Sequence, residues 1–199
     1  VAAEDSVVGF GWRHSWDIRI IELDENTVAY QTANGRRLHF NKDVQDVDGT
    51  DGIDFVPTLG ASKDTLTKHT DGSYWLITED NQTFGFSSVF GSVDFKLTSW
   101  VNAVGRGHNF SYGSTGLTMV SSNWSGQAIR FSYANGRLHR VYASNSSSVD
   151  ALDEQVWNLE HDANGDLTGL TDPMGYQHTY AYLEHLMTSA TDPEGKVYV

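Results

Sequence analysis

Residues 110–140 read FSYGSTGLTMVSSNWSGQAIRFSYANGRLHR, and one short unit occurs twice within this stretch. The unit consists of Phe-Ser-Tyr, a short polar run, a glycine and a leucine. Its first copy begins at Phe110 and its second at Phe131. A unit that recurs at this distance is typical of proteins that stack copies of one small supersecondary element.

The repeat can be followed through the C-terminal half of the chain. Each unit opens with a leucine, most continue with a turn glycine, and an alternating aromatic or apolar stretch leads to a second glycine. In the last unit, Leu183-Glu184-His185 stands where that glycine is expected. A polar insertion near residues 143–154 lengthens one unit, and we expect the strand to resume at about residue 155. The opening leucines are Leu97, Leu117, Leu138, Leu167 and Leu186.

Each unit reads as a β-hairpin. Alternation of apolar and polar residues indicates a strand, because successive side chains of a strand point to opposite faces. The turns contain Asn-Gly and Asp-Pro-x-Gly, which suit tight reversals. One hairpin alone is marginally stable, whereas neighbouring hairpins can share one sheet. The sequence therefore predicts an all-β fold, in which stacked antiparallel β-hairpin repeats form one long curved sheet.

The first half of the chain follows the same logic less regularly. Segments 27–30 and 37–40 flank Ala33-Asn34-Gly35, and segments 73–77 and 82–86 flank Asp80-Asn81. Both pairs predict hairpins, and the acidic stretch 43–54 is expected to be the main loop. We therefore divide the chain into an N-terminal segment with divergent hairpins, residues 1–96, and the regular repeats, residues 97–199.

Composition narrows the classes of function. With 39% apolar and 12% aromatic residues, the chain can bury a core. A formal net charge of -13 argues against nucleic-acid binding and against adsorption to anionic membranes. No apolar run is long enough to insert into a membrane as a helix. Because the chain has no cysteine, it has neither disulfides nor cysteine-ligated zinc.

Three stretches carry a resemblance to a known family. They are ANGRLHRV, ANGDLTGLTDPMGYQHTYAY and LMTSATDPEGK, and the segment GFGWRHSWDIRI at residues 9–20 precedes them. Together they resemble the Rhs/YD-repeat family, whose repeats follow a Gly-x-Gly-Trp-x-His-Ser-Tyr segment. Trp16 stands where that segment usually has tyrosine. The resemblance is close over 97–199 and thinner over the first half.

The resemblance implies a fold and a role. Rhs proteins, the C components of bacterial Tc toxins and the teneurins form a β-sheet that spirals into a hollow shell. In the bacterial proteins the shell encloses a toxin, and teneurins use theirs for adhesion. By resemblance, this chain is a scaffold segment of a secreted or cell-surface bacterial protein. Its implied partners are the remainder of a YD-repeat polypeptide, a toxin cargo, or a surface glycan or receptor.

Within this resemblance, some residues are expected to have structural roles in the repeats and in the segment that precedes them. Aromatic residues should hold neighbouring hairpins together, and glycines should form the turns. These residues are Trp12, His14, Phe110, Tyr112, Gly116, Phe131, Tyr133, Gly136, Gly165, Gly175, Tyr180, Tyr182 and Gly195.

We expect no enzymatic activity and no cofactor. Most carboxylates lie in turns, where aspartate stabilises the backbone locally, so a catalytic pair is not indicated. Asp172-Pro173-Met174-Gly175 and Asp192-Pro193-Glu194-Gly195 are in phase with the repeats and read as turns. The eight histidines show no zinc-binding spacing.

Calcium is the one metal that the sequence suggests. Asp46, Asp48, Asp51 and Asp54 lie in the stretch DVQDVDGTDGID and could offer oxygen ligands. The stretch does not match the EF-hand pattern, and a solvated acidic loop is the simpler interpretation. An extracellular β domain that binds calcium, or carbohydrate through its Tyr and Trp side chains, therefore remains the alternative to a scaffold.

A melting experiment separates the two interpretations of the acidic loop. If residues 43–54 bind Ca²⁺, the melting temperature should rise with added Ca²⁺, because a ligand of the folded state stabilises it. Differential scanning calorimetry in excess Ca²⁺ and in excess chelator measures this effect. Identical melting curves would leave the solvated loop as the better interpretation.

Overall fold

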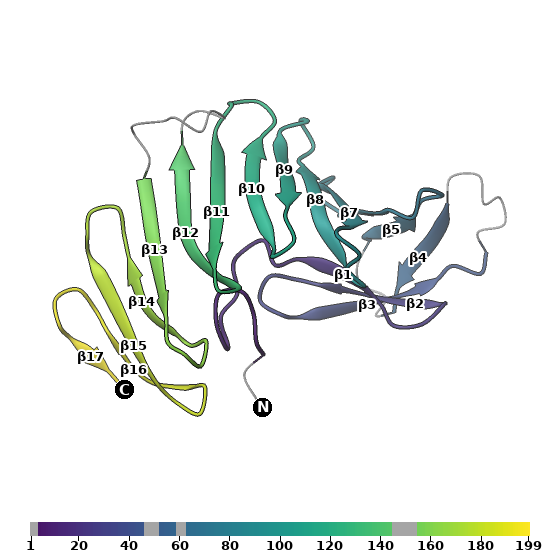
Figure 1. The fold of residues 1–199 in the computed structure, drawn as a ribbon. Coiled ribbons are helices and arrows are strands. Elements are labelled where there is room, and N and C mark those ends of the chain that lie inside the picture. Colours follow the sequence, from purple (N-terminus) through teal and green to yellow (C-terminus); the bar gives the residue numbers. More distant parts are fainter. Residues whose placement is uncertain (1–3, 46–51, 59–62, 145–154) are drawn as a thin grey trace. The chain divides into compact units, whose positions relative to one another are not determined.

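The computed structural model describes residues 4–45, 52–58, 63–144 and 155–199. Within these ranges the chain forms 17 strands and no helix (Figure 1). These residues therefore contain no helix that could cross a membrane. The neighbouring strands of the described residues pair in antiparallel fashion, for example β2 with β3 and β15 with β16. The all-β fold of stacked antiparallel hairpins that the sequence predicts is therefore confirmed.

The chain divides into two compact units, which we describe separately. The ring unit consists of Ser15–Ser111 and Ser122–Ser125, and the repeat unit of Val1–His14, Tyr112–Ser121 and Gly126–Val199. The strands of the ring unit are β1 (Arg19–Glu22), β2 (Thr27–Gln31), β3 (Arg37–Lys42), β4 (Ile53–Pro57), β5 (Thr65–Lys68), β6 (Tyr74–Ile77), β7 (Thr83–Ser88), β8 (Phe95–Val101) and β9 (Gly107–Tyr112). Those of the repeat unit are β10 (Leu117–Ser122), β11 (Ala128–Ala134), β12 (Arg137–Ser144), β13 (Gln155–His161), β14 (Leu167–Thr171), β15 (Gln177–Leu183), β16 (Leu186–Thr191) and β17 (Val197–Tyr198).

The ring unit closes on itself. Each strand from β1 to β8 pairs with the next, and β1 pairs back with β8 through Arg19–Lys96 and Ile20–Phe95. The Arg19 guanidinium also donates to Asp94 at 2.9 Å, and both side chains are mostly buried. The remaining length of the same β8 edge pairs with β9. Strand β8 is therefore the place where the chain leaves the closed sheet.

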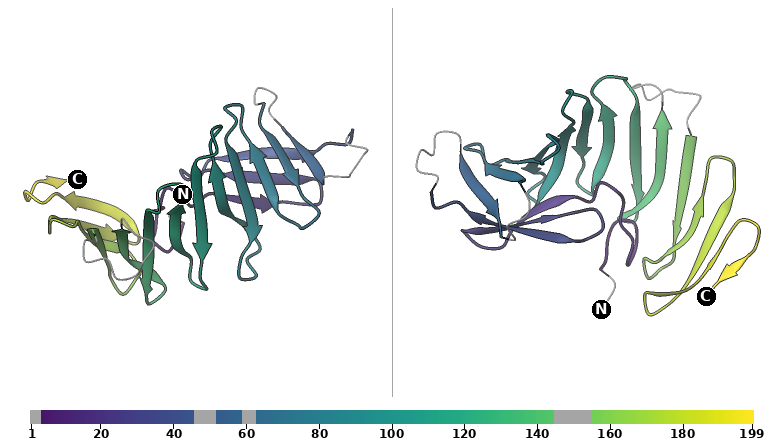
Figure 2. Two further views of the ribbon diagram at one scale, coloured as in Figure 1. Left: turned by 90° about the horizontal axis from the view of Figure 1, so that it is seen from above. Right: turned by 180° about the vertical axis from the view of Figure 1, so that it is seen from behind.

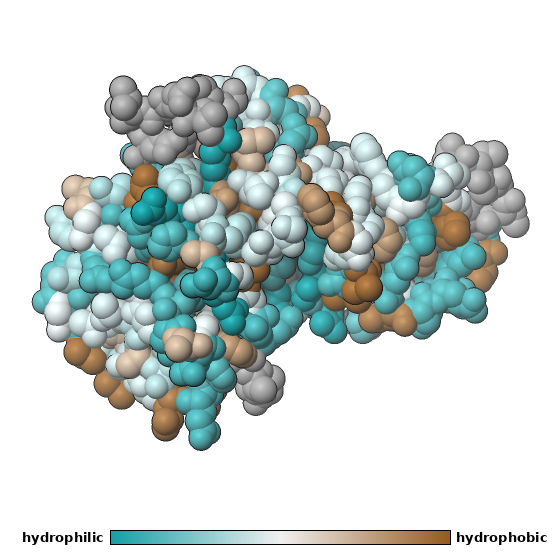
Figure 3. All heavy atoms as spheres, viewed as in Figure 1, coloured by the Kyte–Doolittle hydropathy of each residue, from teal (hydrophilic) through white to brown (hydrophobic). Residues whose placement is uncertain are grey.

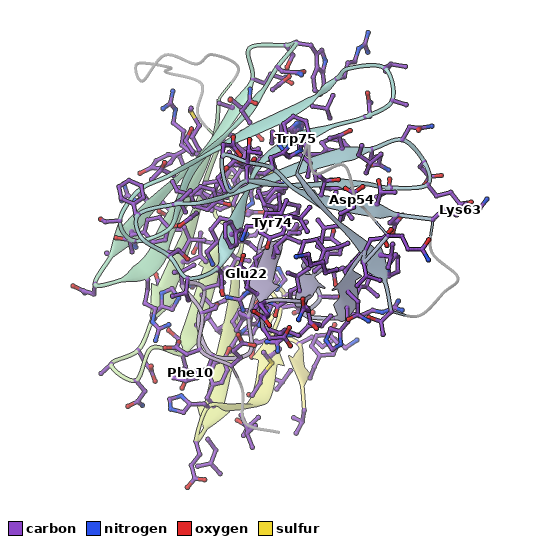
Figure 4. The ribbon with its side chains drawn as sticks, turned by 90° about the vertical axis from the view of Figure 1, so that its right-hand side faces the viewer. Phe10, Glu22, Asp54, Lys63, Tyr74 and Trp75 are labelled. Atoms are coloured by element: carbon purple, nitrogen blue, oxygen red, sulfur yellow. The ribbon has the colours of Figure 1, made fainter. Side chains whose placement is uncertain are left out.

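Alternating side chains fill the interior of the closed sheet. Tyr74 and Trp75 are neighbours on β6 and point to opposite faces (Figure 4). Tyr74 is 1% exposed and Trp75 45%. Burial of one large apolar side chain contributes about 1.5–3 kcal/mol, so the alternation fixes which face lies inside. The other buried interior side chains are Ile20, Val28, Phe40, Phe55, Leu66, Leu76, Phe86 and Leu97.

The two hairpins expected in the first half are confirmed as β2–β3 and β6–β7. The expected loop at 43–54 is wrong at its end, because Ile53 and Asp54 already belong to β4. A strand here lets Phe55 reach the interior, and this apolar gain outweighs the turn preference of the acidic residues around it. Residues 46–51 lie outside the described ranges.

In the repeat unit the hairpins follow one another in sequence order (Figures 1 and 2). The strand expected from about residue 155 is confirmed as β13, while most of the insertion at 143–154 lies outside the described residues. Four turn glycines have positive φ angles that other residues adopt at a cost. These are Gly136 (78°), Gly165 (86°), Gly175 (88°) and Gly195 (83°).

A β-bulge recurs in the hairpins of both units. The register shifts by one residue at Gly85/Phe86, Ser132/Tyr133, Glu160/His161 and Ala181/Tyr182. In each case the extra residue directly follows an apolar residue of the returning strand. A bulge bends its strand and increases the local twist, so one bulge per hairpin curves the sheet in regular steps.

Threonine occupies three of these four bulges. The hydroxyl of Thr98 donates to the carbonyl of Gly85 at 3.1 Å, that of Thr168 to Glu160 at 3.3 Å, and that of Thr188 to Ala181 at 3.2 Å. The carbonyl lies on the opposite strand, directly before the register shift. The threonine hydroxyl thus bridges the two strands at the place where the ladder is interrupted.

This bridge predicts a position-specific loss of stability. Thr168→Val keeps the shape of the side chain but removes the hydroxyl, so the free energy of unfolding should fall by about 0.5–1.5 kcal/mol. Thr171→Val on the same strand is the matched control, because the Thr171 hydroxyl bonds to none of the described residues. Urea unfolding monitored by circular dichroism measures both variants. Equal losses in the two variants would contradict a role for the bulge hydroxyl.

Candidate functional site

Residues 4–14, which we call the N-terminal segment, lie on the repeat unit and contact strand after strand. The carbonyl of Val7 accepts a hydrogen bond from the Leu138 amide at 2.6 Å. The next carbonyl, that of Val8, lies 2.8 Å from Nε2 of His161, and the Val8 side chain is buried. The segment thus pairs through its backbone with residues of β12 and β13.

Trp12 anchors the segment to β15. Its indole Nε1 donates to the hydroxyl of Tyr182 at 2.7 Å, and its ring lies 5.1 Å from the ring of Tyr180. Burial raises the pKa of the Tyr182 hydroxyl, although the bond from Trp12 opposes this effect. The hydroxyl therefore stays protonated at neutral pH. Two aromatic positions of one repeat strand serve as the docking surface for one tryptophan.

A second anchor lies at the turn between β15 and β16. The ring of His185 stacks on Phe10, with 3.7 Å between centroids and 26° between planes. Nδ1 of His185 is 3.0 Å from the carboxylate of Asp166, which is 2% exposed. Both Glu184 (φ 51°) and His185 (φ 65°) adopt left-handed backbone angles without being glycine. These contacts need the histidine side chain, which explains why the last repeat has His185 rather than a glycine at this position.

Arg137 connects the segment to the hairpin turns. Its guanidinium binds the Asp5 carboxylate and the Ser6 carbonyl, and it lies 5.6 Å from the Phe10 ring centroid. A Cβ at Gly165 would collide with this guanidinium. Gly165 therefore has two roles: it adopts the positive φ of the turn, and it leaves space for the Arg137 side chain.

Gly9 shows how closely the segment approaches the sheet. Its φ is 128°, and a Cβ there would lie 3.1 Å from the backbone nitrogen of Leu167. A larger residue would need a small shift between the segment and β14, and would adopt this positive φ with strain. His14 is the last residue of the N-terminal segment, and its ring lies 6.2 Å from that of Phe131.

Comparison with known proteins identifies the repeats. The RHS repeat family matches residues 161–197, which contain β14 to β16, the last residue of β13 and the first residue of β17. The C-terminal hairpins are therefore RHS repeats, as the resemblance to the Rhs/YD-repeat family predicts. A domain of unknown function, DUF6531, matches residues 2–40, a range that contains the whole docked segment.

The chain was also compared with curated proteins and with solved structures. No curated protein matches the sequence. Among solved structures, a porin-like protein from Bacteroides uniformis ATCC 8492 is similar, with a TM-score of 0.44 and 14% sequence identity. The similarity covers 91% of this chain and 92% of that chain.

Four other repeat-motif residues make contacts of their own within each unit. In the repeat unit, the hydroxyl of Tyr133 donates to the Leu117 carbonyl at 2.7 Å, and burial raises its pKa to about 12. Gly116 faces that hydroxyl, which would be 2.8 Å from a Cβ there. In the ring unit, Phe110 is buried and lies 6.3 Å from the Trp16 ring. Tyr112 ends strand β9 and is half-buried.

The calcium candidates are only partly described. Asp46, Asp48 and Asp51 lie outside the described residues, while the Asp54 carboxylate accepts a hydrogen bond from Thr67 at 2.6 Å. Among the residues that the structure describes, no three His, Asp or Glu side chains are grouped as a metal site would require. Calcium binding by the acidic loop stays a prediction.

Sequence reasoning did not anticipate the partners of the N-terminal segment. Val8, Phe10 and Arg137 were not among the residues expected to have structural roles, and their contacts join residues more than 100 positions apart in the chain. One signal was available: the loss of glycine at Glu184-His185 in an otherwise regular repeat. A residue that accepts a strained backbone angle usually has a specific contact that requires its side chain.

Adjacent substitutions test this interpretation of the turn. Glu184→Gly should raise stability by up to about 1 kcal/mol, because glycine adopts a positive φ without strain. His185→Gly relieves the same strain but leaves the buried Asp166 carboxylate without its partner, so we expect a net loss of about 1–3 kcal/mol. Thermal and urea unfolding of both variants measure the difference. A stabilised His185→Gly variant would show that the stacked histidine contributes little.

Proposed function

We propose that this YD-repeat protein is a non-enzymatic structural segment that forms part of the wall of a β-shell. The shell would enclose a toxin cargo, in a protein that is secreted or displayed on the cell surface. Presentation of an adhesion surface is the related role that the same wall would serve. The RHS repeat match and the regular hairpins support the wall. The cargo, the localisation and the absence of catalysis are part of the proposal.

The observation that carries the proposal is the exposure of apolar side chains on both faces of the last strands. Leu183 and Leu186 face each other across β15 and β16 and are 68% and 59% exposed. Met187 is directed to the other face and is 45% exposed, and Tyr198 on β17 is 51% exposed. Hydrophobic surface also shows at the lower left of Figure 3, over the C-terminal hairpins.

Exposed apolar clusters on a soluble protein mark surfaces that another protein segment covers. Among the described strands β17 pairs only with β16, so its outer edge can accept a further strand. Further YD repeats of the same polypeptide are the occupant that fits this edge, because they continue the same hairpin register. The enclosed cargo is the occupant that we assign to the inner face.

The docked N-terminal segment supports the role of a wall. It ties β12, β13 and β15 together through backbone and side-chain bonds, which limits how far neighbouring hairpins can bend against one another. A wall requires such stiffness, since its hairpins otherwise interact only with their direct neighbours.

Protease protection tests the proposal in the native parent polypeptide. The region that follows this chain should resist proteinase K within the parent, and be digested when it is expressed alone. Leu186→Asp should expose it, because a carboxylate disrupts the apolar contact on β16. Met174→Asp, which places the same charge at a 79% exposed turn position, is the matched control.

The proteolysis experiment has a clear opposing outcome. If the following region is digested equally fast inside the parent and alone, the chain does not enclose it, and the shell proposal fails. If Met174→Asp exposes the region as much as Leu186→Asp does, the apolar surface of β15 and β16 is not the covered surface.

A further inference from the structure

A cavity of about 370 Å³ opens at one end of the closed sheet, within the ring unit. Strands β1, β2, β4, β5 and β6 and the turn after β1 contribute to it. A volume of this size falls in the range of about 300–1,000 Å³ that is usual for small-ligand sites. Its lining residues are Glu22, Leu23, Asp24, Glu25, Val28, Ile53, Phe55, Lys68 and Tyr74.

Glu22 is the central polar group of the cavity, and only one of its two oxygens is used. Oε1 accepts hydrogen bonds from Nζ of Lys68 at 2.6 Å and from the Tyr74 hydroxyl at 2.7 Å. Oε2 accepts none from the residues that the structure describes. Burial raises the pKa of Glu22, but the bonds from Lys68 and Tyr74 outweigh this effect and hold the pKa below its usual value. The carboxylate is therefore ionised at neutral pH.

Lys68 presents donors beside that free acceptor. Its ammonium group lies 5.4 Å from the ring centroid of Tyr74 and 5.9 Å from that of Phe95, which fixes its position. Apart from the bond to Glu22, its N–H groups meet no acceptor among the described residues. The side chains of Glu22 and Lys68 are 39% and 32% exposed, so both remain accessible from the cavity.

Apolar side chains complete the cavity. Phe55 and Tyr74 are buried beneath it and pack ring against ring, with 6.1 Å between centroids. Figure 4 shows Tyr74 directed towards Glu22. Ile53 and Leu23 are 37% and 45% exposed, and so offer apolar surface at the opening. A ligand here would meet an acceptor and donors side by side, with hydrocarbon around them.

We propose that this cavity binds the ring of a neutral sugar. Two adjacent ring hydroxyls would bridge the pair, one donating to Oε2 of Glu22 and the other accepting from Nζ of Lys68. The C–H face of the ring would lie against Ile53 and Leu23. A ligand cation is disfavoured, because Lys68 already occupies the place between the carboxylate and the rings.

The charge of the cavity sets its selectivity. Three carboxyl groups, those of Glu22, Asp24 and Glu25, oppose one ammonium group. An anionic sugar would bring a further carboxylate close to Asp24 and Glu25, and like charges repel. Neutral sugars should therefore bind better than uronic acids of the same ring size.

Titration followed by amide NMR shifts tests the site in the whole chain. The probes are methyl α-D-glucoside, methyl α-D-galactoside, methyl α-D-mannoside and sodium glucuronate. We expect saturable shifts with at least one neutral glycoside, centred on Glu22, Lys68 and Tyr74, and binding of glucuronate at least about tenfold weaker. Glu22→Gln should weaken the glycoside at least about tenfold, because it removes a charged acceptor.

The matched control is Glu79→Gln, which changes the same charge at an exposed residue outside the cavity. It should leave binding unchanged, and its melting curve and that of Glu22→Gln report whether both variants fold. The proposal is overturned if none of the three neutral glycosides gives saturable shifts, or if the shifts map elsewhere. It is also overturned if folded Glu22→Gln binds as the parent does, or if glucuronate binds equally well. None of these outcomes bears on the protease test of the shell.

Discussion

The structure depends on one recurring interruption of its hydrogen-bond ladder. In hairpins of both units, a single extra residue on the returning strand shifts the register, and in three of four cases a threonine hydroxyl bridges back to the opposite carbonyl. In the fourth, His139 takes the extra position, and its Nδ1 lies 3.3 Å from the Leu159 carbonyl of the next strand. Because side chains alternate along a strand, each shift also decides which residues face the interior beyond it.

The same interruption serves two different ends. In the ring unit it lies between β7 and β8, and β8 has to pair with both β1 and β9 along one edge. A bulge at Thr98 redirects the strand between these two partners. In the repeat unit it recurs in successive hairpins and places Tyr133, His161 and Tyr182 directly after each shift. Two of these three residues then contact the N-terminal segment.

The local features of the fold could be predicted from the sequence, because they have local causes. The alternation of apolar and polar residues predicts the strands, including the start of β13, and the Asn-Gly and Asp-Pro-x-Gly sequences predict the turns. Ring closure could not be predicted, since it rests on two residue pairs, Arg19–Lys96 and Ile20–Phe95, that leave no pattern in either segment. Strand β4 was missed because turn-forming aspartates surround it.

The candidate sites show the same limit. Trp12 and Tyr182 could each be chosen from their motifs, but nothing in either motif says that one binds the other. The Glu22–Lys68 pair was not singled out at all, because a glutamate and a lysine 46 positions apart are unremarkable until a closed sheet brings them to the same opening. Side chains that act together across the sheet can be recognised only once the register is known.

The anchoring of the N-terminal segment has a consequence for biosynthesis. Trp12 reaches a partner 170 residues later in the chain, and Val8 one 153 residues later. A ribosome adds about 5–20 residues per second, so residues 4–14 wait on the order of ten seconds after their synthesis for their binding surface. Each hairpin, by contrast, can form as soon as its own two strands are outside the ribosome. The N-terminal segment is thus made well before its binding surface, and its docking reports that the strands up to β15 are complete.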